Sequence, residues 1–225
     1  MINKTQTLKA CELFGDLSLA EHSKFASVCR EMSFKRGEII FQEGDRAGNI
    51  VIVATGQVKA MRYTSEGMEL IVEIFGKCDI MGVIAVFANE PHAHTAVAMT
   101  EVSTLVIRKD DFIELIGSNI QTSMKVMRYL GQRIRNLQEK VQDFISDKVE
   151  QRIAKLLVAL TKRMGKEIPF TRQEIAAMVG TSIETAIRVT SRFKEAGILK
   201  SSRGKIFVLN LEKLGIIAEG PPVKF

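Results

Sequence analysis

The sequence predicts an α+β protein with three parts: an N-terminal β roll (jelly roll), a long central helix and a C-terminal winged helix-turn-helix. Three observations support this prediction: a block of short segments rich in β-branched residues, a stretch with a heptad apolar repeat, and two short amphipathic segments around a glycine. We place the parts at residues 1–118, 119–146 and 147–225. A chain of 225 residues has room for them, because one domain commonly takes roughly 100–200 residues.

The β roll is predicted from the region between Phe34 and about Ile107. Short segments rich in valine, isoleucine and aromatic residues alternate there with glycine-containing turns, and the expected strands are residues 38–41, 50–54, 57–63, 70–75 and 95–99. Short strands that are separated by a turn about every 8–12 residues are typical of an antiparallel sandwich or roll. No stretch in this block is long enough for a crossover helix, so a βαβ fold is not expected.

The central helix is predicted from residues 119–145, where apolar residues recur at alternating spacings of three and four. This pattern forms a narrow stripe, here called the seam, which consists of Met127, Leu130, Ile134, Leu137, Val141 and Phe144. A narrow stripe of this kind is buried when it meets a matching stripe, which predicts a parallel homodimer. The alternative is a helix that packs on its own β domain.

The C-terminal part is expected to begin where Ser146 and Asp147 interrupt the repeat. Short oxygen-bearing side chains accept hydrogen bonds from the first turn of a helix, so this pair is expected to cap a helix from Lys148 to Met164. Gly165 is then expected to end that helix as a left-handed cap.

Two short helices and a hairpin follow. Thr171 and Glu174 match the Thr-x-x-Glu capping box, Gly180 supplies a tight turn, and Ser182 begins the second helix. Two β-rich segments then flank the Arg203-Gly204 turn. Two helices around a glycine turn, followed by a hairpin, predict a winged helix-turn-helix.

The second of these helices carries the candidate base-reading residues. Its exposed face is expected to hold Ser182, Ile183, Glu184, Ile187, Arg188 and Arg192. Arginine matches the paired acceptors of guanine, and glutamate can accept from the amino group of cytosine. Glu184 and Arg188 are four positions apart and share a face; the alternative is that they only form a surface salt bridge. Candidates for phosphate contacts are Thr171, Arg172, Gln173, Ser191 and Lys194.

Charge is distributed unevenly along the chain. Residues 147–225 hold 15 Lys and Arg against 8 Asp and Glu, whereas residues 1–146 hold 17 against 18. A basic C-terminal part suggests a polyanionic partner, and the alternative is a solvated basic surface. No apolar run approaches the roughly 18 residues of a membrane span, and no secretory signal is apparent. The three cysteines form no CxxC pair, so we expect a reducing compartment, the cytoplasm.

With these motifs the chain resembles the cAMP receptor protein/FNR (CRP/FNR) family of bacterial transcription regulators. The matching segments are residues 37–45, 79–82, 95–96, 139–141 and 171–176. The resemblance implies a cyclic-nucleotide-binding-type β roll, a dimerisation helix, and a DNA-reading domain that is reoriented when an effector binds. The expected partners are double-stranded DNA with a two-fold symmetric operator, a second copy of the chain, RNA polymerase and a small-molecule effector, and no membrane.

The chain departs from the cAMP-binding members of that family at the effector pocket. These members hold the ribose with a glutamate and the cyclic phosphate with an arginine, and the corresponding residues here are Val83 and His94. Val83 cannot accept a hydrogen bond, and histidine is a weaker, pH-dependent anion partner. We therefore expect a non-cAMP branch, with an effector pocket formed by Gly82, Val83, Ile84, His94, Thr95, Leu137 and Gln138.

The sequence also bears on other modes of sensing, through an iron–sulfur cluster, haem or cysteines, and on other classes of function. An iron–sulfur cluster needs about four thiolates, and this chain has three scattered cysteines. His92 or His94 could ligate haem, and Cys11 and Cys78 could sense redox state. A function of another class is a ligand-binding module that controls a partner protein. No Ser-His-Asp set, HExxH or phosphate-loop motif occurs, so we do not expect an enzyme.

Overall fold

The computed structural model describes residues 3–11, 13–15, 17–202 and 204–220. It divides into two compact units: the described parts of Met1–Arg62 with Val72–Arg135, and those of Tyr63–Ile71 with Asn136–Phe225. The three-part division expected from the sequence stays a prediction. Arg203 of the expected hairpin turn lies outside the described residues. Among the helices that the structure describes, none is long and apolar enough to cross a membrane.

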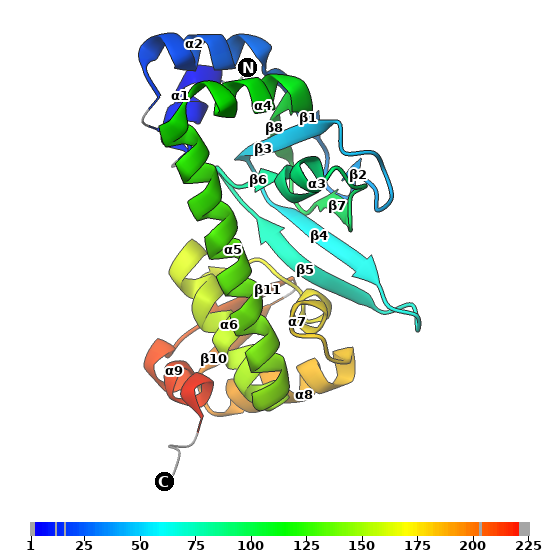
Figure 1. Cartoon of the computed structure of the whole chain (residues 1–225). Coiled ribbons are helices and arrows are strands. Elements are labelled where there is room, and N and C mark those ends of the chain that lie inside the picture. The colour runs from blue at the N-terminus through cyan, green and yellow to red at the C-terminus, as the bar shows by residue number, and fades with distance from the viewer. Residues whose placement is uncertain (1–2, 12, 16, 203, 221–225) are drawn as a thin grey trace, which may run out of the picture. The chain divides into compact units, whose positions relative to one another are not determined.

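The N-terminal unit is a β roll with helices at one end (Figure 1). Its sheets follow the orders β1-β8-β3-β6 and β2-β7-β4-β5. The pairings β1–β8, β3–β8, β3–β6, β2–β7 and β4–β7 are antiparallel. The strands are β1 (Arg30–Phe34), β2 (Ile39–Phe41), β3 (Asn49–Thr55), β4 (Val58–Tyr63), β5 (Glu69–Phe75), β6 (Ile80–Met81), β7 (Thr95–Ala98) and β8 (Val102–Arg108). The helices are α1 (Lys4–Ala10), α2 (Leu19–Val28), α3 (Val83–Ala88) and α4 (Lys109–Ser118).

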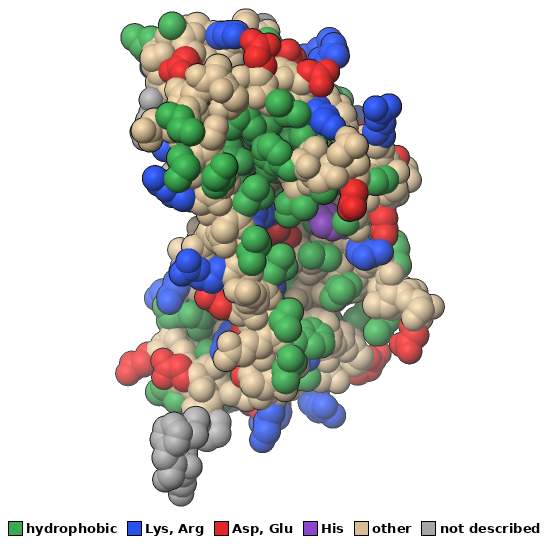
Figure 2. Space-filling model, viewed as in Figure 1, with side chains coloured by type: hydrophobic (Ala, Val, Ile, Leu, Met, Phe, Trp, Pro, Cys, Tyr) green, Lys and Arg blue, Asp and Glu red, His purple; other side chains and the backbone are tan. Residues whose placement is uncertain are grey.

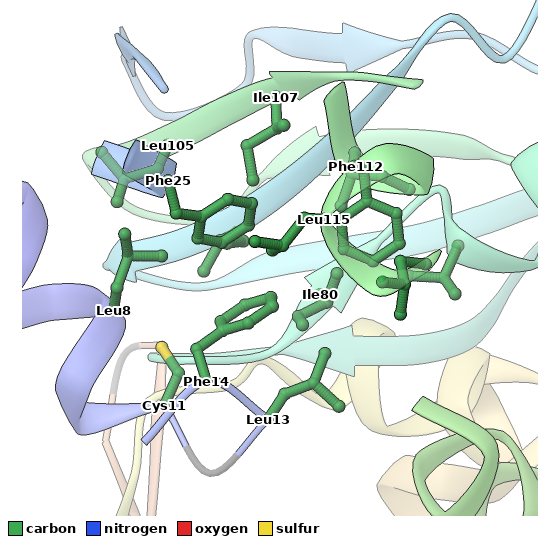
Figure 3. Packing of buried hydrophobic residues seen from close by; sticks show 14 of the residues in the cluster. Leu8, Cys11, Leu13, Phe14, Phe25, Ile80, Leu105, Ile107, Phe112 and Leu115 are labelled. Carbon is green, nitrogen blue, oxygen red and sulfur yellow. The ribbon is translucent and has the colours of Figure 1, made fainter. Parts of the chain in front are cut away.

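Residues 50–54 of strand β3 are all apolar because both faces of the strand are buried. Side chains alternate between the two faces of a strand, and here both faces are covered. Ile50 and Ile52 point into a core shared with the helices, whereas Val51 and Val53 point into a second core between the sheets. Figure 3 shows the first core, where the rings of Phe14 and Phe25 lie 4.8 Å apart between centroids. The β roll predicted from the sequence is therefore confirmed.

The long helix α5 (Ile120–Ser146) begins where the Asn119 side chain accepts hydrogen bonds from the backbone N–H groups of residues 121 and 122. One of its faces packs on the β roll. Val126 is buried there, and the Tyr129 hydroxyl donates to the Ile80 carbonyl at 3.0 Å. The seam residue Leu130 is half-buried against the same core, so at this position the helix packs on its own domain.

The C-terminal unit is a winged helix-turn-helix, as the sequence predicts. Its elements are α6 (Val149–Met164), β9 (Glu167–Ile168), α7 (Arg172–Val179), α8 (Ile183–Glu195), β10 (Leu199–Ser202), β11 (Lys205–Val208) and α9 (Leu211–Glu219). The hairpin β10–β11 is joined by β9 into a three-stranded sheet. The capping box is present, because Thr171 and Glu174 exchange backbone-to-side-chain hydrogen bonds of 2.7 and 3.1 Å. Gly180 adopts the left-handed conformation at the turn between α7 and α8.

Two local predictions at the ends of α6 are wrong. The N-cap is Lys148 rather than Ser146 or Asp147. The Ser146 hydroxyl donates instead to the carbonyl of residue 142, and Asp147 pairs with Lys155 at 2.7 Å. At the other end, Gly165 has φ +89° and ψ −175°, which is not the left-handed helical conformation. Ser146 and Asp147 do not cap α6 because their side chains bind other partners, and the local sequence does not indicate these partners.

Candidate nucleic-acid interface and effector pocket

Helix α8 presents one apolar and one polar face. Its inner face packs Ala186, Val189 and Phe193 into the core of the C-terminal unit. Glu184 and Arg188, on the opposite face of α8, are exposed. The Ser182 hydroxyl accepts the Thr185 N–H at 3.2 Å and so satisfies a backbone donor of the first turn. Ile183 and Ile187 are exposed beside the two charged residues, which leaves the whole predicted reading face open.

The two charged residues on this face are not paired with each other. The Glu184 carboxylate accepts hydrogen bonds from its own backbone N–H and from the Ser182 hydroxyl, which lowers its pKa below the usual value. Within the part of the chain that the structure describes, no ion pair joins Glu184 to Arg188. The Glu184 carboxylate is therefore ionised at neutral pH, and neither side chain is neutralised by the other. This geometry disfavours the simple surface salt bridge.

Arg192 differs from Arg188 because it already has a partner. Its guanidinium donates to both carboxylate oxygens of Glu150 on α6, at 3.1 and 3.2 Å. Both bonds come from the same guanidinium nitrogen, and each is a hydrogen bond between charged groups. Arg192 therefore braces α8 against α6 in this structure, and a contact with a ligand would require it to share or leave Glu150.

The predicted phosphate-contact residues lie on several elements. Thr171 and Arg172 border a cleft of about 450 Å³ between the start of α7 and the β10–β11 hairpin. Lys205 and Ser201 also line this cleft, and the buried Ser201 hydroxyl has no hydrogen-bond partner among the described residues. Gln173 and Lys194 are exposed and Ser191 is half-buried. Lys and Arg side chains project from the edge of the unit that α8 forms (Figure 2).

Two domain families match the chain in the order in which the fold places them. Residues 31–119 match the cyclic nucleotide-binding domain, and residues 151–215 match the Crp-like helix-turn-helix domain. The chain belongs to the CRP/FNR family. It is a DNA-binding transcription regulator rather than an enzyme.

Individual members of the family are distant relatives. The chain is 27% identical over 205 residues to the CRP-like cAMP-activated global transcriptional regulator of Mycobacterium tuberculosis, covering 86% of this chain and 92% of the relative. It is 26% identical to the transcriptional activator protein anr of Pseudomonas aeruginosa, covering 86% and 82%. The structure of FixK2 from Bradyrhizobium japonicum has the same fold, with a TM-score of 0.76 at 22% identity over 84% of this chain and 96% of that one.

The residues predicted to form the effector pocket have different environments in the structure. Gly82 has φ +86°, and a Cβ at this position would come within 2.7 Å of the Asn49 carbonyl oxygen, so only glycine fits. Val83 is 3% exposed and packs into the core, whereas Ile84 is exposed. Thr95 is half-buried, and its hydroxyl accepts the Glu43 N–H at 3.1 Å. Leu137 and Gln138 lie on α5 in the other unit.

His94 lies among charged side chains. Burial lowers its pKa most, the nearby Arg62 and Arg133 lower it further, and Glu43 opposes them. The imidazole is therefore mostly neutral at pH 7. Arg62 is itself paired with Glu43 at 2.6 Å. His94 can act as a hydrogen-bonding group here, but it carries little of the positive charge that a cyclic phosphate would need.

Arg133 lies near His94 but was not among the residues predicted for the effector pocket. It forms an ion pair with Glu73, and its guanidinium lies over the rings of Phe75 and Tyr129 at 4.9 and 5.2 Å. The signal that could have identified it is its offset from the seam, because residue 133 lies on the side of the helix that carries Val126.

The surroundings of the two histidines do not fit haem. His92 is buried and stacks on Phe41, with ring centroids 3.8 Å apart and an angle of 14° between the planes. The Phe41 ring therefore covers one face of the imidazole. His94 lies among Arg62, Glu43 and Arg133 instead of the apolar walls that a porphyrin needs. Among the described residues, no group of three or more His, Cys, Asp or Glu side chains could hold a metal ion.

Proposed function

We propose that the protein is a cytoplasmic homodimer that reads a two-fold symmetric operator with two copies of α8, and that a small effector other than cAMP controls it. The observation that carries the reading role is the exposed, unpaired Glu184 and Arg188 on the recognition helix of a winged helix-turn-helix. RNA polymerase is the expected protein partner at the promoter.

The exposed side of α5 supports the proposed dimer. Met127 and Ile134 are 63% and 59% exposed in the single chain, and Leu137, Val141 and Phe144 are exposed as well. Figure 2 shows hydrophobic side chains exposed at intervals along this helix. A row of large apolar side chains at heptad spacing is buried when it pairs with an identical row. Two α8 helices would then reach half-sites roughly 34–36 Å apart.

Replacing Arg188 by alanine is expected to relax sequence preference at one base pair of each half-site. The loss should be about 1–3 kcal/mol at that position, because a bidentate arginine contact discriminates against the wrong base by that amount. Binding-site selection followed by affinity measurements on single-base variants of the operator would measure it.

Lys213→Ala is the matched control, since it removes one positive charge from α9 and leaves α8 intact. It should keep the sequence preference of the unaltered protein. An Arg188→Ala protein that discriminates bases as well as this control would remove Arg188 from the reading role. Affinity measured at several salt concentrations tests the role of DNA itself, because phosphate contacts make binding weaken steeply as salt rises.

The side chains at the predicted effector pocket in the N-terminal unit support an effector other than cAMP. Val83 is buried and offers no acceptor to a ribose hydroxyl. His94 is held mostly neutral, and the Arg133 guanidinium is already occupied by Glu73. A cyclic nucleotide would thus meet neither the acceptor nor the free cation that it requires.

Adding cAMP is accordingly expected to leave the thermal unfolding midpoint of the protein unchanged. A ligand present at 100 times its dissociation constant stabilises the folded state by about 2.7 kcal/mol, which a thermal shift assay detects readily. Cyclic GMP and 5′-AMP serve as comparison ligands. A rise in the midpoint that is specific to cAMP and saturates with concentration would contradict the proposed effector class.

A further inference from the structure

Two of the three cysteines lie side by side in the N-terminal unit although they are 67 positions apart in the chain. Cys11 follows α1 and is fully buried at the edge of the helix-covered core, near Leu8 and Phe14 (Figure 3). Its thiol lies next to the thiol of Cys78 and donates to the Thr7 carbonyl at 3.1 Å. Cys78 packs against the same core from the turn before β6.

The second thiol is accessible from outside the core. Cys78 is half-buried and lines a cavity of about 810 Å³ between the N-terminal segment, the β5–β6 turn and the side of α5. Lys77, Lys125 and Arg128 line the same cavity. On α5 the lining residues 125, 128, 129 and 132 are not seam positions, so dimerisation through the seam leaves this cavity open.

The backbone at Cys78 is held in an unusual conformation. Its φ of +69° is in the left-handed region that side chains other than glycine rarely adopt. The turn is fixed by the Cys78 N–H, which donates to the Val53 carbonyl at 2.8 Å, and by the Asp79 carboxylate, which accepts the Gly76 N–H at 2.7 Å. Non-glycine residues in such strained conformations are often found at functional sites.

We propose that Cys78 and Cys11 form a reversible disulfide when a small hydroperoxide enters this cavity. The Cys78 thiolate attacks the peroxide oxygen, the O–O bond breaks, and the leaving alkoxide or hydroxide takes up a proton. The sulfur of Cys11 then attacks the resulting sulfenic acid, and its proton leaves with the hydroxyl group as water. Two thiols lose two electrons to the peroxide, and one S–S bond replaces two S–H bonds.

The environments of the two sulfurs assign these roles. Burial, together with the neighbouring Cys78 thiol, raises the pKa of Cys11 far above its usual value, so Cys11 is a poor first nucleophile. Cys78 faces the cavity and meets the oxidant first. The disulfide would tie the end of α1 to the turn that borders α5, at the wall formed by Tyr129. This inference concerns the N-terminal unit alone and does not depend on DNA binding.

The test is peptide mapping of the oxidised full-length protein. Reduced protein is treated with hydrogen peroxide, its remaining thiols are alkylated, and a non-reducing digest is analysed by mass spectrometry. We expect a Cys11–Cys78 linked peptide, the loss of two of the three free thiols, and their return after treatment with dithiothreitol. No link, or a link to Cys29 or between chains, overturns the proposal.

Three variants make the result specific. Cys29→Ser should keep the link, because the Cys29 thiol lies at the end of α2 and donates to the Phe25 carbonyl at 3.0 Å. Cys78→Ser, at the half-buried position, should abolish the link while the circular dichroism spectrum is unchanged. Cys11→Ser should leave Cys78 as a sulfenic acid that dimedone traps. If Cys78 is not trapped in a folded Cys11→Ser protein, it is not the attacking thiol and the proposal is wrong.

Discussion

Replacing Ile134 by glutamate is expected to convert the protein to a monomer and to lower its affinity for a symmetric operator by roughly 100- to 10,000-fold. Ile134 is in the middle of the seam and is exposed in the single chain. In a dimer, two carboxylates would be forced together in an apolar interface. Without the dimer, each half-site must be bound independently, and the gain from linking two reading helices is lost.

Gln132→Glu is the matched control for this prediction. It adds the same charge to the same helix at an exposed position off the seam. It should stay dimeric in sedimentation velocity and keep its operator affinity, while binding of Ile134→Glu to a single half-site should be unchanged. A dimeric Ile134→Glu protein would show that the apolar stripe has a different role, such as contact with another protein.

Replacing Phe193 by alanine is expected to destabilise the C-terminal unit by about 3–5 kcal/mol, the usual cost of deleting a buried aromatic ring. Phe193 is 2% exposed and anchors the second half of α8 to the core of that unit. DNA binding should fall as well, because α8 would no longer be held in a fixed orientation. Hydrogen exchange of the amides of α6–α9 in increasing urea would measure the loss of stability.

Lys194→Ala, one position further along, is the control because its side chain is exposed. It should leave the exchange rates of the unit unchanged. Similar exchange rates in both variants would mean that the Phe193 ring is not part of the unit's stabilising core.

The C-terminal unit could be predicted from the sequence because its signals are local. The Thr171 capping box, the turn at Gly180 and the spacing of the buried residues of α8 all lie within about thirty residues of each other. The central helix was predicted for the same reason. Its exposed seam is visible in the heptad spacing, although the half-burial of Leu130 against the β roll is not.

The effector region could be predicted only in part, because its groups come from distant segments. The ion pair of Arg133 with Glu73 joins a helix to a strand 60 positions earlier, and no local pattern indicates it. The short helices α1–α4 have weaker periodicity than α5 and were not predicted individually. The proximity of Cys11 to Cys78 is likewise a tertiary fact, since their spacing in the chain gives no indication of a pair.

Multi-angle light scattering of the protein with an excess of a selected operator duplex tests the central claim most directly. Two chains joined along α5, each placing α8 in one half-site, should give a complex of two chains and one duplex, and the free protein should already be a dimer. One chain per duplex, with the free protein a monomer at the same concentration, would contradict the claim that the seam joins two chains for DNA reading.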